Sequence, residues 1–279
     1  MASMTVWTRV FVCAAVTVAP FVAASTPAEA GVGDLLVAPT RIVLDGRKGT
    51  EVVLNNIGDE PATYRISVEF RRMDGSGTLQ DVAEPTAADK TAEDMLVYAP
   101  RRVTLAPHEP QSIRIAARPP QGVADGEYRI HLLFRAIPPA NPVVQQAAAE
   151  QQKGLRFQLT PVYGVTIPVI VRLGNLQATA GIANVHVDKK DGEPIVALDL
   201  SRSGSRSTFG EVRVMKAGVK DPVALQRGVA VYTEVSSRHV AVPVNPAFKG
   251  QLAGPVTVQY VETFDDGSHV IAETQAVLR

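Results

Sequence analysis

The chain has 279 residues, and its 28 basic and 28 acidic side chains cancel to a formal net charge of zero. With 46% hydrophobic and 20% charged residues it can bury sizeable cores, which excludes a wholly disordered chain, while its length excludes a disulfide-stapled miniprotein. Neutrality and the lack of a Lys/Arg block argue against nucleic acid as a partner, because phosphate recognition needs a basic excess.

The first thirty residues, 1–30, are expected to be an export signal peptide. Arg9 supplies a positive charge, residues 10–24 form an apolar run, and Ala28-Glu29-Ala30 matches a small-x-small cleavage site. An uncleaved membrane anchor is the weaker alternative, because the run is shorter than the roughly 20 residues that span a bilayer. The only cysteine, Cys13, would leave with the signal, so the mature chain would hold no thiol, disulfide or thiolate metal site.

From Asp34 onward, short apolar runs alternate with period two between Gly, Pro, Asn and Asp residues, which is typical of all-β sandwiches. Candidate strands of the first half are residues 35–44, 50–56, 62–70, 95–98, 111–117, 128–135 and 155–172. A second series follows at residues 181–187, 194–201, 211–216, 229–232, 239–244, 255–263 and 270–278. We therefore expect an all-β protein with an N-terminal immunoglobulin-like domain, 31–173, and a C-terminal β-sandwich domain, 174–279.

The end of the first series is unusual. Residues 140–154 are polar and rich in Ala and Gln, which predicts a long mobile loop or a marginal helical turn, with or without a role. An apolar stripe of alternate residues then runs from Leu155 to Val171, far longer than the usual strand of about five or six residues. Either one edge strand projects beyond its sandwich, or two shorter strands are split at Pro161, which cannot donate a ladder hydrogen bond.

Catalytic and metal motifs are lacking. The five histidines never occur at local metal-ligand spacing, and no nucleophile elbow, P-loop or dinucleotide fingerprint is present. We expect neither an enzyme nor a metal or cofactor. A hydrolase would require a buried histidine with a perturbed pKa beside Ser or Asp.

Several first-half segments resemble the periplasmic chaperones of the chaperone-usher pathway of pilus assembly. The matching segments are Pro39-Thr40-Arg41-Ile42-Val43-Leu44, Val53-Leu54-Asn55-Asn56, Leu105-Ala106-Pro107, Gln111-Ser112-Ile113-Arg114 and Phe134-Arg135-Ala136-Ile137-Pro138-Pro139. The resemblance covers residues 34–173 and is weak over the second half. It implies two immunoglobulin-like domains in a boomerang-like arrangement, a periplasmic location, and pilin-like subunits and an outer-membrane usher as partners.

The resemblance also implies residue roles. Members of this family lend their seventh strand to an incomplete subunit and hold the subunit's C-terminal carboxylate. By this analogy Leu155, Phe157, Leu159 and Tyr163 are the donor side chains, and Arg41 is the carboxylate-binding residue. Glu127, Arg172 and Asp265 correspond to an interdomain salt-bridge network. The family's second basic anchor is replaced here by Pro168.

The function implied by the resemblance is therefore a chaperone that binds, stabilises and caps fimbrial subunits by donor-strand complementation and delivers them to an usher. The alternative is an exported structural or adhesive β-sandwich module that binds a partner without donating a strand. Whether the unoccupied chain caps itself as a homodimer is left open.

Overall fold

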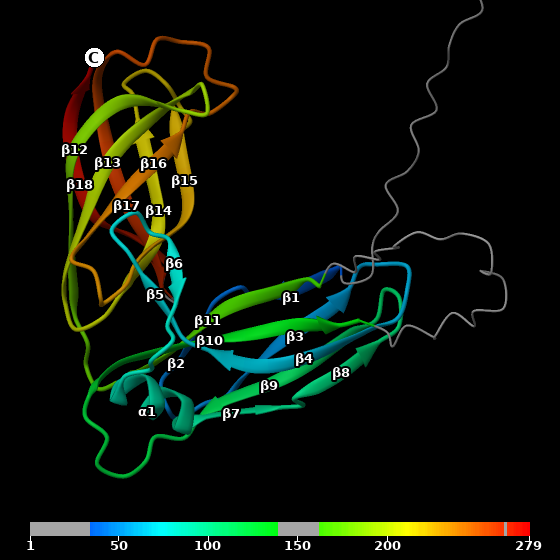
Figure 1. The fold of residues 1–279 in the computed structure, drawn as a ribbon. Helices are drawn as coiled ribbons and strands as arrows, with labels where there is room; N and C mark the ends of the chain where they lie inside the picture. Colours follow the sequence, from blue (N-terminus) through cyan, green and yellow to red (C-terminus); the bar gives the residue numbers. More distant parts are fainter. Residues whose placement is uncertain (1–33, 139–161, 265–266) are drawn as a thin grey trace, which may run out of the picture.

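The computed structural model describes residues 34–138, 162–264 and 267–279. Two β-sandwiches meet at an angle, with the first lying across the foot of the second (Figure 1). The predicted fold class, a pair of angled all-β sandwiches, is confirmed. In the described ranges, no helix has the length and apolar character needed to cross a membrane.

The first sandwich packs a four-stranded sheet, β1-β3-β9-β7, against a five-stranded sheet, β2-β11-β10-β4-β8. The strands of the first sheet are β1 (Leu35–Ala38), β3 (Thr50–Asn56), β9 (Pro110–Ala117) and β7 (Leu96–Ala99). Those of the second are β2 (Ile42–Leu44), β11 (Gly164–Leu173), β10 (Gly126–Ile137), β4 (Ala62–Glu69) and β8 (Arg102–Leu105). Alternate inward residues such as Leu54, Ile113 and Phe134 are fully buried between the two sheets, as the period-two pattern requires.

The expected single strand over residues 35–44 is in fact two strands in different sheets. β1 pairs with β3 of the first sheet, whereas β2 pairs in parallel with β11 of the second. Pro39 lies between them and has no N–H to donate to a ladder, so the chain leaves one sheet there and joins the other. This change of sheet places Arg41 immediately before β2.

Two elements between β4 and β7 were not expected. One is a hairpin of β5 (Arg71–Met73) and β6 (Leu79–Asp81), and the other is the helix α1 (Ala87–Met95). The hairpin rises from the first sandwich and lies beside the second, in the angle between them (Figure 1). The short strand predicted at residues 95–98 is β7, displaced by one residue because α1 continues to Met95.

The second sandwich packs the sheet β12-β13-β16 against β15-β14-β17-β18. Its strands are β12 (Ala178–Lys190), β13 (Glu193–Gly204), β14 (Thr208–Met215), β15 (Ala224–Val231), β16 (Ser237–Pro243), β17 (Gly254–Phe264) and β18 (Gly267–Leu278). A separate core forms around Leu198, Val214 and Tyr260. A third, smaller cluster joins the two sandwiches and holds Ile170 of β11, Met73 of the hairpin, and Ala230 and Tyr232 of the second sandwich.

Candidate binding site between the two sandwiches

The outer edge of β11 is only partly paired. β10 pairs with β11 along its whole length, but β2 covers the other side only from Val169 to Val171. Among the described strands, residues 164–168 therefore keep one edge without a neighbour. Unpaired backbone groups on a sheet edge can hydrogen-bond to a strand of another chain, although Pro168 at the end of this stretch contributes no donor.

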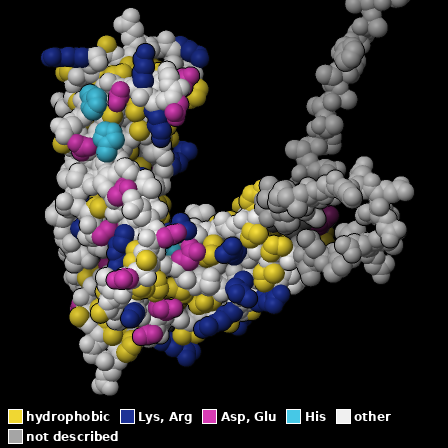
Figure 2. Space-filling model, in the orientation of Figure 1, with side chains coloured by type: hydrophobic (Ala, Val, Ile, Leu, Met, Phe, Trp, Pro, Cys, Tyr) yellow, Lys and Arg dark blue, Asp and Glu magenta, His cyan; other side chains and the backbone are white. Residues whose placement is uncertain are grey.

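Apolar side chains are exposed around this edge. Tyr163, just before β11, is 57% exposed, and Leu36 on β1 and Val43 on β2 are about half exposed. Hydrophobic side chains gather on the visible face of the first sandwich (Figure 2). Inside the same strand, Ile167, Val169 and Val171 are buried in the core, which agrees with the inward half of the predicted stripe. Leu155, Phe157 and Leu159 lie outside the described residues, so their predicted role is not tested.

Arg41 lies where the two sandwiches meet. Its guanidinium carbon is 4.5 Å from the ring centroid of Phe209 and 5.9 Å from that of Tyr232, both in the second sandwich. Burial lowers the pKa of Arg41 and the neighbouring Tyr232 opposes this shift, but a guanidinium stays charged. Nη1 is buried without a hydrogen-bond partner, and no described residue forms an ion pair with Arg41. The planar guanidinium thus stacks against aromatic rings, while no described residue accepts a hydrogen bond from Nη1.

Arg41 lines a pocket of about 310 Å³ between the hairpin and the two sandwiches. Arg41 and Pro168 line it from the first sandwich, and Phe209 and Tyr232 from the second. The lining residues described by the structure include no Asp or Glu. An apolar pocket with an unpaired guanidinium is suited to an anionic group carried on an apolar ligand.

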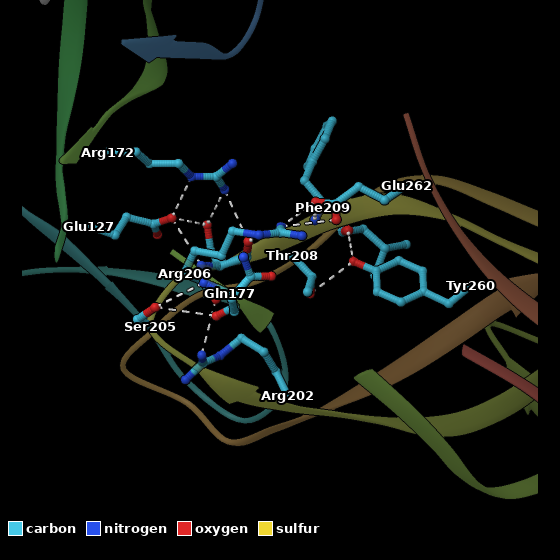
Figure 3. Close-up of polar contacts among 12 residues, drawn as sticks. Glu127, Arg172, Gln177, Arg202, Ser205, Arg206, Thr208, Phe209, Tyr260 and Glu262 are labelled. Atoms are coloured by element: carbon cyan, nitrogen blue, oxygen red, sulfur yellow. Dashed lines mark hydrogen bonds and ion pairs between the residues drawn. The ribbon is translucent and has the colours of Figure 1, made fainter. Parts of the chain in front are cut away.

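Glu127 and Arg172 form a buried ion pair that contacts the second sandwich (Figure 3). Arg172 Nε donates to Glu127 Oε2 at 3.0 Å, and the Glu127 carboxylate is 1% exposed. Ser207, which precedes β14, donates its backbone N–H and its hydroxyl to the same carboxylate oxygen, both at 2.9 Å. Arg172 Nη2 donates to the Ser207 carbonyl at 3.0 Å. Ser207 of the second sandwich is therefore hydrogen-bonded to both members of the ion pair in the first sandwich.

A neighbouring pair completes this junction within the second sandwich. Arg206 Nη1 donates to both carboxylate oxygens of Glu262 at 3.0 Å, and the Phe209 N–H donates to Glu262 Oε1 at 3.1 Å (Figure 3). These bonds hold Phe209, the ring over which Arg41 stacks. Asp265, the third residue expected in the interdomain network, lies outside the described residues.

Sequence reasoning missed a second interdomain contact, centred on Glu234. Arg129 of β10 donates to both carboxylate oxygens of Glu234 and stacks at 3.7 Å over the ring of Tyr232. The Met73 N–H of the hairpin donates to Glu234 Oε1 at 2.8 Å. Although burial opposes the shift, the hydrogen bond from Arg129 holds the pKa of Glu234 below its ordinary value. No pattern in the sequence marks this pair, because its members lie 105 residues apart.

Comparison with known proteins gives only structural matches. No family model and no curated protein matches the chain. The solved structures with a similar fold include the Escherichia coli chaperone DraB, with 15% identity, a TM-score of 0.47, and coverage of 90% of this chain and 99% of that one. The Pseudomonas aeruginosa CupB2 chaperone has 14% identity, a TM-score of 0.45 and coverage of 88% and 100%. The chaperone–tip subunit complex CsuC–CsuE of archaic Csu pili of Acinetobacter baumannii matches with 13% identity, a TM-score of 0.44 and coverage of 88% and 97%.

Proposed function

We propose that this protein is a periplasmic assembly chaperone that binds pilin-like subunits by donating the edge of β11, and that it acts without turnover or cofactor. One observation carries the proposal: the free edge of β11 leads directly to Arg41. β2 is parallel to β11 and pairs with it at Val169–Val171. A ligand strand that paired in parallel with residues 164–168 would therefore lie end to end with β2, on the same side of β11. Because Arg41 immediately precedes β2, the C-terminal end of that strand would meet the guanidinium.

In this proposal Arg41 binds the subunit's terminal carboxylate. A guanidinium offers two parallel N–H donors to a carboxylate, and here the flanking rings of Phe209 and Tyr232 fix its plane. Tyr163 and the preceding Leu155, Phe157 and Leu159 would enter the subunit. Each fully buried donor side chain contributes on the order of 1.5 to 3 kcal/mol, before the cost of ordering is subtracted.

We also propose that the chain divides into two domains, residues 31–173 and residues 174–279. Gly174 follows β11 with φ +80°, and a Cβ there would lie 2.1 Å from Asp125 Oδ2, so the joint requires glycine. The pairs Glu127–Arg172 and Arg129–Glu234 would then act as interdomain contacts that hold the binding angle. An outer-membrane usher as the receiving partner is part of the proposal.

The proposal is tested by co-purification of the protein with coexpressed pilin-like subunits from the periplasm. The wild type is expected to yield a one-to-one complex, and the double variant Phe157→Ser, Leu159→Ser is expected to lose it. The matched control is Val270→Ser, Val277→Ser, which removes two exposed apolar side chains from β18 of the second sandwich and should retain capture. Circular dichroism would show that each variant is folded.

Arg41→Gln gives a second, independent prediction. Removing a charged hydrogen bond of about 1.5 to 3 kcal/mol should weaken subunit capture about tenfold or more, while the protein stays folded.

If the wild type captures no subunit although it is folded and monomeric, the exported β-sandwich binding module becomes the better description. Unaltered capture by the Phe157, Leu159 double variant would contradict strand donation.

A further inference from the structure

A second arginine lines the pocket of Arg41, and it comes from the other sandwich. Arg238 lies on β16, and its guanidinium borders the pocket together with Arg41 and Tyr232. The pocket lining therefore brings one arginine from each sandwich to the same cavity. Nothing in the spacing of Arg41 and Arg238 along the chain indicates that they meet.

Arg238 is held in place but is not neutralised. Its Nη1 donates to the Ala230 carbonyl at 2.6 Å, whereas its Nε is buried without a partner and no described carboxylate forms an ion pair with it. Burial lowers the pKa of Arg238, and Tyr260, Tyr232 and Asp74 are the groups that oppose the shift. Buried positive charges without a counter-ion are costly, and an anionic ligand would offset that cost.

The β5–β6 hairpin covers Arg238. Gly77, at the hairpin turn, has φ +85°, and a Cβ there would lie 2.1 Å from Arg238 Nε and 2.6 Å from Nη2. The Gly75 carbonyl of the same turn accepts a hydrogen bond from the His239 N–H at 2.8 Å. The turn is thus fastened to β16 and leaves room for the guanidinium only because residue 77 has no side chain.

We propose that Arg238 is a second positioning residue for the carboxylate of the bound strand, which would be held between Arg41 of the first sandwich and Arg238 of the second. This inference rests on the proposed function and extends it, because Pro168 occupies the place where a second base was expected on β11. Two guanidinium groups from different sandwiches would bind a carboxylate only while the interdomain angle is kept. Binding of the carboxylate would therefore depend on the interdomain angle and would stabilise the angle at which both arginines contact the ligand.

The test is NMR observation of the Arg41 and Arg238 Nε–H signals of the mature protein while a small carboxylate is added. The probes are N-acetyl-dialanine with a free carboxylate and the same peptide as its C-terminal amide. The free acid is expected to shift both signals along one saturation curve, and the amide is expected to shift neither. Arg238→Gln should weaken the acid-induced shift of Arg41 about tenfold, as expected for loss of one charged hydrogen bond.

Arg227→Gln is the matched control, because it removes a guanidinium that is exposed and pairs with Glu211 on the same sandwich. It should leave the titration of Arg41 unchanged. If only the Arg41 signal responds to the acid, or if Arg238→Gln titrates as the wild type does, the role of Arg238 is wrong while the chaperone function stands. If neither signal responds, the role of Arg238 is likewise overturned. Subunit co-purification then decides the chaperone function separately.

Discussion

At the scale of the residue, His131 on β10 is an ionisable side chain sealed inside the molecule. It is 1% exposed, and neither ring nitrogen has a hydrogen-bond partner among the described residues. Burial, reinforced by the nearby charges of Arg129, Arg71 and Arg72 and opposed by Glu234, lowers the pKa of His131 to about 3. The folded protein therefore keeps this imidazole neutral near neutral pH.

Unfolding returns His131 to an ordinary pKa of 6.5, so the unfolded chain binds a proton that the folded chain does not. The free energy of unfolding should consequently fall as the pH drops below about 6.5, with a loss on the order of 1 kcal/mol between about pH 7.5 and 5.5. His131→Phe is expected to remove this dependence, measured by urea unfolding at each pH. His186→Phe, at an exposed site on β12, should retain the wild-type slope; an unchanged slope in His131→Phe would contradict the assignment.

At the scale of the element, the sequence before α1 contains a helix-capping motif, although the surrounding pattern predicted only strands. Thr86 and Asp89 form a reciprocal capping box, in which Thr86 Oγ1 accepts from the Asp89 N–H at 3.3 Å and Asp89 Oδ2 accepts from the Thr86 N–H at 2.7 Å. Arg72 of the hairpin donates to the same carboxylate oxygen. The cap thus fixes both the start of the helix and the base of the hairpin.

Thr86→Ala removes the cap and should lower the free energy of unfolding by about 1 kcal/mol. Thr91→Ala is the control within the same helix, since the Thr91 hydroxyl is exposed and bonds only to the Ala87 carbonyl. It should change stability by less than about 0.5 kcal/mol. Equal effects of the two substitutions in urea unfolding would show that the capping box contributes little.

Elements with a clean period of two were predictable, and those with an interrupted period were not. β9 lies close to its expected position because it buries alternate apolar residues, and β13 does so because it carries a short run of buried apolar residues from Ile195 to Leu198. The hairpin strands β5 and β6 are three residues long, too short to show any period. The Thr86–Asp89 spacing was available as a helix signal, but the change of sheet between β1 and β2 depends on pairing with distant strands.

The candidate site was predictable only in its first-sandwich half. Arg41 and the pair Glu127–Arg172 follow from the resemblance of residues 34–173. Their contacts with Phe209 and Ser207 depend on how two separately folded sandwiches meet. No local pattern encodes such an encounter, which is why Glu234 and Arg238 were found only in the structure.

At the scale of the whole molecule, the buried pair Arg129–Glu234 is the strongest test of the interdomain angle. The side chains are 5% and 19% exposed. Glu234→Gln leaves Arg129 buried without a counter-ion and should cost about 3 to 5 kcal/mol in the free energy of unfolding. Small-angle scattering should show a broader distribution of interdomain angles in this variant.

The control for Glu234→Gln is Glu51→Gln, which breaks the exposed pair between Arg114 and Glu51 in the first sandwich. Exposed pairs contribute about 0 to 1 kcal/mol, so this variant should be nearly as stable as the wild type and scatter identically. A loss of stability of the same small size in both variants would mean that Glu234 does not hold the two sandwiches together.

The short strand β2 limits where a ligand strand can end on β11. It ends the free edge of β11 at Pro168, because an incoming strand cannot occupy the place where β2 is already paired, from Val169 onward. In the proposed binding mode, β2 would therefore limit how far a ligand strand extends along β11, and the terminus of that strand would lie at Arg41. Segments that continue beyond this point would collide with β2. The protein would therefore read where a polypeptide ends rather than which side chains it carries, and distinguish true C-termini from internal strands of the same composition.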